Sequence, residues 1–252
     1  DYLRQPPEAR MTHYVREGRL YHVMLPQQFE EPLMEKLFDT ADLIKEITRK
    51  SNGSGFLKSV LRHKKVMLYF TQPSTRTFLS FLAACQLVGI DTAEVRDPSL
   101  SSEYKGESQE DGVRVFSSYF DCIVMRDPKP GFCEYMAYLL DATGRSVPIL
   151  NGGSGKDQHP TQALLDMMSI KEKFGKLKGL KIAIVGDIIH SRVALSNIYG
   201  LQKMGAKVTL CGPPHLIPRG IHELGVSVNT DIDEVSEWAD ALNVLRIQRE
   251  RM

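Results

Sequence analysis

The chain has 252 residues, 42% hydrophobic and 25% charged, which is ordinary for a folded globular protein with one large or two modest domains. Its 32 basic and 31 acidic residues nearly cancel, so no overall field favours binding to nucleic acid or an anionic membrane. No run approaches the roughly 18 apolar residues of a membrane span, and the N-terminus lacks an apolar signal core. Four cysteines without CxxC spacing are expected to be reduced packing residues, and we expect a cytoplasmic protein.

The chain begins with a polar, proline-dotted stretch, residues 1–26, that we expect to form an extended N-terminal arm. Glu30 to Arg49 follows with apolar residues at helical spacing, which predicts an amphipathic helix. The glycine- and serine-rich residues 51–55 predict a flexible break.

From residue 66 onward, short apolar runs alternate with helical ones. The predicted strands are Val66–Phe70, Thr92–Val95, Cys122–Met125, Val147–Leu150, Lys181–Val185, Lys207–Leu210, Val226–Val228 and Ala241–Leu245. The predicted helices are Phe78–Val88, Gln109–Tyr119, Gly131–Leu140, Thr161–Phe174, Arg192–Met204 and Ile232–Trp238.

This alternation predicts an α/β protein with two doubly wound parallel sheets covered by helices on both faces. We place the domain boundary near Phe174–Gly179, which gives a first domain at 27–175 and a second, incomplete one at 176–252. In such sheets ligands bind beyond the carboxyl ends of the strands, so the residues that follow each strand are the candidates for a binding site.

Several common sites are excluded. Gly152 to Lys156 suggests a phosphate loop, but the first glycine is missing and Asp157 follows the lysine. Gly186 to His190 lacks the dinucleotide fingerprint, and His159 has no partner at metal-ligand spacing. No nucleophile elbow occurs. We therefore expect neither metal nor cofactor.

The most informative stretch is Ser74-Thr75-Arg76-Thr77, between a predicted strand and a predicted helix. A helix N-terminus has unpaired N–H groups and partial positive charge, and hydroxyls and a guanidinium add donors for phosphate. An ordinary helix cap would explain the hydroxyls. It would not explain Arg76, a cation where the helix dipole disfavours one.

Other polar residues also follow predicted strands. Arg126 directly follows one, although an ion pair with Asp127 is an equally simple role. His159 and Gln162 share the start of a helix and could hold a carbonyl oxygen and an amide, although His159 could simply cap that helix.

Arg246 and Gln248 follow the last strand on one side of an extended segment, or they form a solvated chain end. Arg192 follows its strand as Arg76 does. Four arginines, one histidine and no carboxylate pair suit an electrostatic transfer reaction between polyanionic substrates.

These motifs resemble the aspartate/ornithine carbamoyltransferase family from about Gln28 to Met252. Ser74–Thr77 is similar to the family's carbamoyl-phosphate motif, and Val124-Met125-Arg126 and 159–166 (HPTQALLD) match two further signatures. Arg246-Ile247-Gln248-Arg249-Glu250 resembles the segment typical of the aspartate branch. The resemblance implies transfer of a carbamoyl group from carbamoyl phosphate to the amine of L-aspartate in pyrimidine biosynthesis.

The resemblance also implies a cytoplasmic homotrimer in which each active site borrows a loop from a neighbouring chain. That loop matches 99–107, with Lys105 and, by position, Ser101 as the borrowed residues, while Ser99 and Ser102 remain alternatives. A regulatory or pathway-enzyme partner is compatible with the family.

The implied roles fall into three groups. Carbamoyl phosphate would contact Ser74, Thr75, Arg76, Thr77, Ser101, Lys105, Arg126, His159 and Gln162. Catalysis would rest on Arg76, Thr77, Arg126 and His159. The aspartate carboxylates would contact Lys105, Arg192, Arg246 and Gln248.

Two departures keep alternatives open. The family motif usually continues with a second arginine, where this chain has Phe78. Family members also continue past the Arg246 segment, so we expect poor activity from the sequence as given. A non-catalytic homologue that binds ligand or a partner chain, and a carbamoyltransferase for another amine, are the competing hypotheses.

Overall fold

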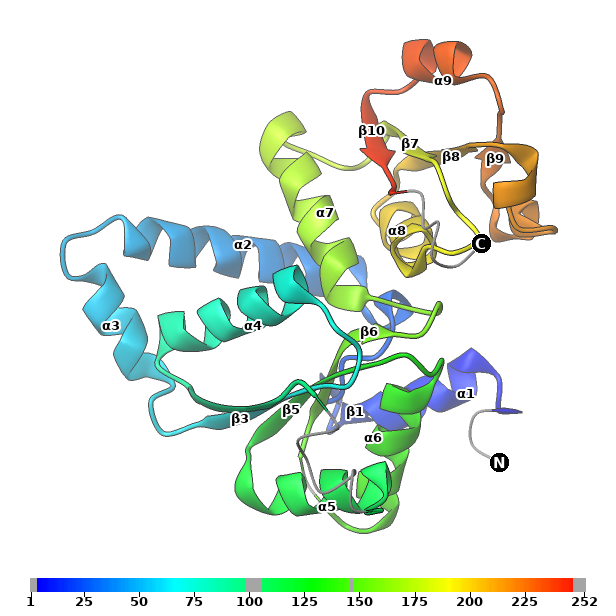
Figure 1. The fold of residues 1–252 in the computed structure, drawn as a ribbon. Helices are drawn as coiled ribbons and strands as arrows, with labels where there is room; N and C mark the ends of the chain where they lie inside the picture. The colour runs from blue at the N-terminus through cyan, green and yellow to red at the C-terminus, as the bar shows by residue number, and fades with distance from the viewer. Residues whose placement is uncertain (1–3, 98–105, 146, 247–252) are drawn as a thin grey trace. The chain divides into compact units, whose positions relative to one another are not determined.

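The computed structural model describes residues 4–97, 106–145 and 147–246. The chain forms two compact units. Unit 1 comprises the residues up to Met24 together with Glu35–Gly155, and unit 2 comprises Leu25–Met34 together with the residues from Lys156 onward. Each carries its own four-stranded, all-parallel sheet, which confirms the predicted fold class (Figure 1).

Unit 1 is built on a sheet with the strand order β4-β3-β5-β6. Its strands are β3 (Lys65–Phe70), β4 (Asp91–Val95), β5 (Cys122–Asp127) and β6 (Ile149–Ser154). Its helices after α2 (Glu31–Thr48) are α3 (Gly53–Val60), α4 (Thr75–Val88), α5 (Gln109–Tyr119) and α6 (Phe132–Ala142).

Helices cover both faces of this sheet because side chains along a strand alternate between faces. On one face Phe70 packs against Phe78 of α4, with ring centroids 5.4 Å apart. On the other, Tyr69 packs against Phe116 of α5 at 5.4 Å. Strands β3, β5 and β6 are therefore mostly buried, as parallel strands usually are, whereas the edge strand β4 is largely exposed.

Unit 2 repeats this architecture with the strand order β10-β7-β8-β9. Its strands are β7 (Lys181–Val185), β8 (Lys207–Cys211), β9 (Ser227–Val228) and β10 (Ala241–Val244). Its helices are α7 (Pro160–Phe174), α8 (Arg192–Lys203) and α9 (Ile232–Trp238). Val235 of α9 packs on Ala183 and Cys211, which lie on one face of the sheet.

Each sheet has a topological switch point, which is the place between two neighbouring strands from which the chain adds further strands in opposite directions. In unit 1 this switch point lies between β3 and β5, because β4 is added on one side of β3 and β5 on the other. In unit 2 it lies between β7 and β10. Ligands of open α/β sheets bind at the carboxyl ends of the strands that flank such points.

The structure corrects the expectation for the N-terminal residues. Instead of an extended arm, the segment forms a short helix, α1 (Pro7–Met11), and a hairpin of β1 (Val15–Arg16) and β2 (Arg19–Leu20). Val23 then pairs with Leu150 of β6. Two ion pairs hold this N-terminal segment against the rest of unit 1: Arg10 pairs with Glu134 of α6, and Arg16 pairs with Asp141 of the same helix.

Two further expectations were wrong. The flexible break at residues 51–55 is the start of α3, where the chain approaches the end of α2 so closely that a Cβ on Gly53 would lie 1.6 Å from the carbonyl oxygen of Ile47. The glycine there permits packing rather than flexibility. Similarly, the strand predicted to end at Leu150 continues as β6 to Ser154, so Gly152 and Gly153 are strand residues.

Among the described residues, no helix combines the length and apolar character that a membrane span requires.

Candidate functional site

The first turn of α4 presents the donors expected of a phosphate seat. Ser74 is the N-cap residue, but its side chain makes no capping hydrogen bond, so the simple cap interpretation of its hydroxyl is wrong. The N–H groups of Thr75, Arg76 and Thr77 have no partner within an α-helix. Within the described part of the chain, the exposed Arg76 guanidinium forms no hydrogen bond or ion pair. This end of the helix is therefore a positive site whose charge no described side chain offsets through a hydrogen bond or ion pair.

Arg126 lies beside this turn because β5 is the neighbour of β3. Phe70 is paired with Arg126 in the sheet register, and the N–H of Thr71 donates to the Arg126 carbonyl oxygen at 3.0 Å. The register between β5 and β6 shifts at Arg126, so that one residue of β5 faces two of β6. The half-buried Arg126 guanidinium donates to the carbonyl oxygen of Gly152 at 3.0 Å.

Asp127 anchors the end of β5 and was not among the predicted residues. Its carboxylate accepts hydrogen bonds from the Thr71 hydroxyl, from the Gln109 amide at 3.3 Å and from the N–H of Lys129 at 2.7 Å. The residue is 2% exposed. The sequence shows an acidic residue after the predicted strand Cys122–Met125. It does not show the partners of that residue, because they come from three different segments. We infer a structural role for Asp127 in holding the loop that precedes Ser74.

In unit 2, His159 is the N-cap of α7 and is buried, but its side chain makes no capping hydrogen bond. Its N–H donates to the Ser196 hydroxyl at 2.8 Å, and that hydroxyl donates to the side-chain oxygen of Gln158 at 2.7 Å. Ser196 is fully buried on α8. The backbone of His159 is thus fixed by a polar group on another helix, which the sequence analysis missed.

Gln162 is held by a carboxylate one turn further along α7. Its amide donates to Asp166 Oδ1 at 2.8 Å. The other oxygen, Oδ2, accepts from Asn197 of α8 at 2.7 Å and from Asn243 of β10 at 3.3 Å. The signal that could have revealed this network is the polar pair Ser196-Asn197 between the apolar residues Val193–Leu195 and Ile198 of α8.

The two predicted arginines of unit 2 flank its switch point. Arg192 is the first residue of α8, as in the predicted helix Arg192–Met204, and it is 6% exposed. The preceding Ser191 caps that helix, because its hydroxyl accepts from the N–H of Ala194 at 3.2 Å. Arg246 is exposed beyond β10, directly after Leu245, whose N–H donates to the Val185 carbonyl oxygen at 2.7 Å.

The predicted residues therefore divide into two clusters. The unit 1 cluster comprises Ser74, Thr75, Arg76, Thr77 and Arg126, all at the β3/β5 switch point. The unit 2 cluster comprises His159, Gln162, Arg192 and Arg246, linked through α7, α8 and β10. Ser99, Ser101, Ser102, Lys105 and Gln248 lie outside the described residues. Both clusters are rich in cations and donors, which suits anionic ligands.

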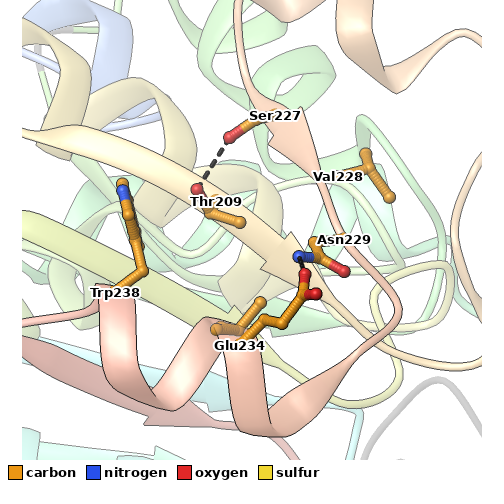
Figure 2. Close-up of a pocket in the computed structure, with 7 residues that line it drawn as sticks. Thr209, Ser227, Val228, Asn229, Glu234 and Trp238 are labelled. Atoms are coloured by element: carbon orange, nitrogen blue, oxygen red, sulfur yellow. Dashed lines mark hydrogen bonds between the residues drawn. The ribbon is translucent and has the colours of Figure 1, made fainter.

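A pocket of about 420 Å³ in unit 2 lies elsewhere. Figure 2 shows Thr209 of β8 hydrogen-bonded to Ser227 of β9, and Asn229 donating to Glu234 of α9, with Trp238 beside them. None of the described residues predicted for the site lines this pocket. Also, no three His, Cys, Asp or Glu side chains gather in the described ranges in a way that could hold a metal ion.

Comparison with protein families gives one match, to the aspartate/ornithine carbamoyltransferase carbamoyl-phosphate-binding domain, over residues 21–172. Among similar proteins, an aspartate carbamoyltransferase catalytic subunit of Moorella thermoacetica is 46% identical over 221 residues, or 86% of this chain and 68% of that protein. The corresponding subunit of Carboxydothermus hydrogenoformans is 41% identical over 233 residues, 91% of this chain and 71% of that protein.

Solved structures agree. The catalytic subunit of M. jannaschii aspartate transcarbamoylase matches with a TM-score of 0.80 and 32% identity, over 92% of this chain and 76% of that chain. The Trypanosoma cruzi aspartate transcarbamoylase in complex with carbamoyl phosphate and aspartate matches with a TM-score of 0.77 and 29% identity, over 92% and 74%.

Proposed function

Because the chain belongs to the aspartate/ornithine carbamoyltransferase family, we propose that it transfers the carbamoyl group of carbamoyl phosphate to the amine of L-aspartate. The products are N-carbamoyl-L-aspartate and phosphate, and the reaction is a step of pyrimidine biosynthesis. Relatives of 41–46% identity from Moorella thermoacetica, Carboxydothermus hydrogenoformans and Halothermothrix orenii are aspartate carbamoyltransferase catalytic subunits, which supports the aspartate branch.

The single observation that carries the proposal is the Arg76 guanidinium at the positive end of α4, which has no hydrogen-bond or ion-pair partner among the described residues. Carbamoyl phosphate supplies the anion that this site needs. The N–H groups and hydroxyls of Ser74, Thr75 and Thr77 bind its phosphate together with Arg76. Arg76 and Arg126 then offset the charge that develops as phosphate leaves.

The carbamoyl group is activated by polarisation of its carbonyl oxygen. His159, Arg126 and Thr77 donate to that oxygen, and Gln162 fixes the amide nitrogen. The neutral aspartate amine attacks the carbonyl carbon, and the C–N bond forms. The tetrahedral intermediate then collapses as the C–O bond to phosphate breaks, and the departing phosphate takes up the proton that the amine nitrogen loses.

Arg192, Arg246 and Lys105 supply positive charge for the two carboxylates of aspartate, and the neutral amide of Gln248 donates a further hydrogen bond to them. We assign Lys105 and Ser101 to a neighbouring chain of a homotrimer. Holding two anions in register removes most of the entropy barrier of a bimolecular step. An arginine at 246 also disfavours a cationic co-substrate such as ornithine.

The test is phosphate release from carbamoyl phosphate in the presence of L-aspartate or ornithine. Turnover with aspartate alone supports the proposal, and turnover with ornithine alone contradicts it. Ligand-induced thermal stabilisation without turnover would identify the non-catalytic homologue. The trimer is tested by light scattering and by complementation, in which mixing Lys105→Ala and Arg76→Ala chains restores part of the activity.

A further inference from the structure

Phe78 stands where the family motif usually has a second arginine, and its ring is part of the core of unit 1. The side chain is 2% exposed and packs edge-to-face on Phe70. An apolar ring at this position removes one cation from the first turn and a half of α4. The structure shows which group lies against that ring.

The Arg96 guanidinium carbon lies 4.3 Å from the centre of the Phe78 ring. Arg96 directly follows β4, and β4 pairs in parallel with β3 in a register that places Val95 beside Tyr69. The residues after β4 therefore lie at the same carboxyl-terminal edge of the sheet as the residues that lead to Ser74. A second guanidinium is thus brought to the start of α4 from a neighbouring strand.

Two features of Arg96 favour an anion. A guanidinium that contacts an aromatic ring through its central carbon can still donate through its five N–H groups. Within the described part of the chain, the Arg96 side chain makes no hydrogen bond or ion pair, and its guanidinium lies over the Phe78 ring. Like Arg76, it adds positive charge near the positive end of a helix, where an unbound cation is disfavoured.

We propose that Arg96 is a second phosphate-binding guanidinium, which the Phe78 ring holds in place at the carbamoyl-phosphate seat. This inference rests on the proposed function and extends it, since it names a residue outside the family motif. The aromatic ring fixes the plane of the guanidinium and so lowers the conformational entropy that an arginine loses when it binds an anion. Phe78 then supports binding through Arg96 rather than weakening it.

The experiment uses isothermal titration with inorganic phosphate and the KM for carbamoyl phosphate. Arg96→Met is expected to weaken phosphate binding and to raise that KM by about tenfold or more, the range for a charge-assisted hydrogen bond. Arg96→Lys keeps the charge but loses the planar fork, so its affinity is expected to lie between those of the wild type and Arg96→Met. The KM for aspartate should change little.

Arg62→Met is the matched control, because Arg62 is exposed and precedes β3 at the opposite edge of the same sheet. It removes the same charge and should leave phosphate affinity unchanged. If Arg96→Met lowers the melting temperature but binds phosphate as Arg62→Met does, Arg96 only shields the core and the inference is overturned.

Failure of the proposed function is distinguishable from failure of this inference. A wild-type protein that binds phosphate but transfers no carbamoyl group, with binding lost in Arg96→Met, overturns the function and leaves the inference standing. Normal carbamoyl transfer by the wild type, with equal phosphate affinity in Arg96→Met and Arg62→Met, supports the function and overturns the inference about Arg96. No binding of phosphate or carbamoyl phosphate by the wild type overturns both.

Discussion

The Arg126 guanidinium donates a hydrogen bond to the carbonyl oxygen of Gly152, 3.0 Å away, across the register shift between β5 and β6. The contact holds part of the guanidinium against the backbone, so the side chain is oriented before substrate binds. Pre-oriented donors stabilise developing charge at little reorganisation cost.

Replacing Arg126 with Met should therefore lower kcat/KM by about a hundredfold or more, the usual effect of removing one such donor. Arg126→Lys keeps the charge but cannot donate to Gly152 and to substrate in the same geometry, so we expect only partial recovery. Steady-state kinetics with both substrates measures the loss. Wild-type kcat/KM in Arg126→Met would remove Arg126 from the mechanism.

Ser196→Ala should destabilise the fold by about 1–3 kcal/mol, because it leaves the N–H of His159 and the side chain of Gln158 without their buried partner. Urea unfolding followed by circular dichroism measures the change. Ser169→Ala is the matched control, since that exposed hydroxyl on α7 bonds only within its own helix. Equal effects of the two substitutions would show that the buried link between α7 and α8 contributes nothing.

Gly186→Ala should raise the KM for aspartate, because Gly186 has a φ of +122° and a Cβ there would lie 2.9 Å from the carbonyl oxygen of Leu245. That contact displaces the segment that leads into Arg246. Gly175→Ala is the control, with a positive φ of +74° but open space around its Cβ. It should cost stability by about 1–2 kcal/mol without changing the KM. A KM change shared by both variants would point to general destabilisation.

His22 makes the stability of unit 1 dependent on pH. Burial lowers its pKa, Arg16 lowers it further, and Asp141 opposes both effects. Its Nδ1 accepts from the N–H of Ile149 at 3.0 Å, a bond that protonation would break. The folded state thus prefers neutral histidine, so this contribution is complete above about pH 6.5 and is lost as the pH falls through the lowered pKa.

His22→Gln removes the ionisation while an amide oxygen can still accept from Ile149. Melting temperatures between pH 7.5 and 5 should fall more steeply for the wild type than for His22→Gln. Parallel curves would show that His22 does not titrate on unfolding in this range.

Cys122 should be inert in the folded protein, because burial raises its pKa to about 12. Burial also raises the pKa of Cys85 and of Cys211. Only thiolates react readily with alkylating agents. Mass spectrometry after iodoacetamide treatment at pH 8 should find Cys122 unmodified in the native protein and modified in urea. Rapid native modification would contradict the raised pKa of Cys122.

The order of strands and helices could be predicted from the sequence because apolar periodicity is a local property. Gln109–Tyr119 and Ile232–Trp238 have the bounds predicted for them. Two of the errors in predicted secondary structure occurred at glycines, because a glycine can either break an element or allow close packing within one. At Gly53 it permits close helix packing, and at Gly152 it permits a bulged strand, whereas local rules indicate a break in both cases.

The sequence by itself determined which groups are available for chemistry: hydroxyls and Arg76 before a helix, His159 and Gln162 at another helix start, and arginines after strands. These depend on spacing along one segment, and they were enough to indicate phosphate. Strand order was decided only by the tertiary structure, because it depends on which segments pair across long separations. That order puts Arg126 beside the first turn of α4, and Arg246 across the switch point from Arg192. It also carries Arg96 to the ring of Phe78, a contact between residues 18 positions apart that no local pattern encodes.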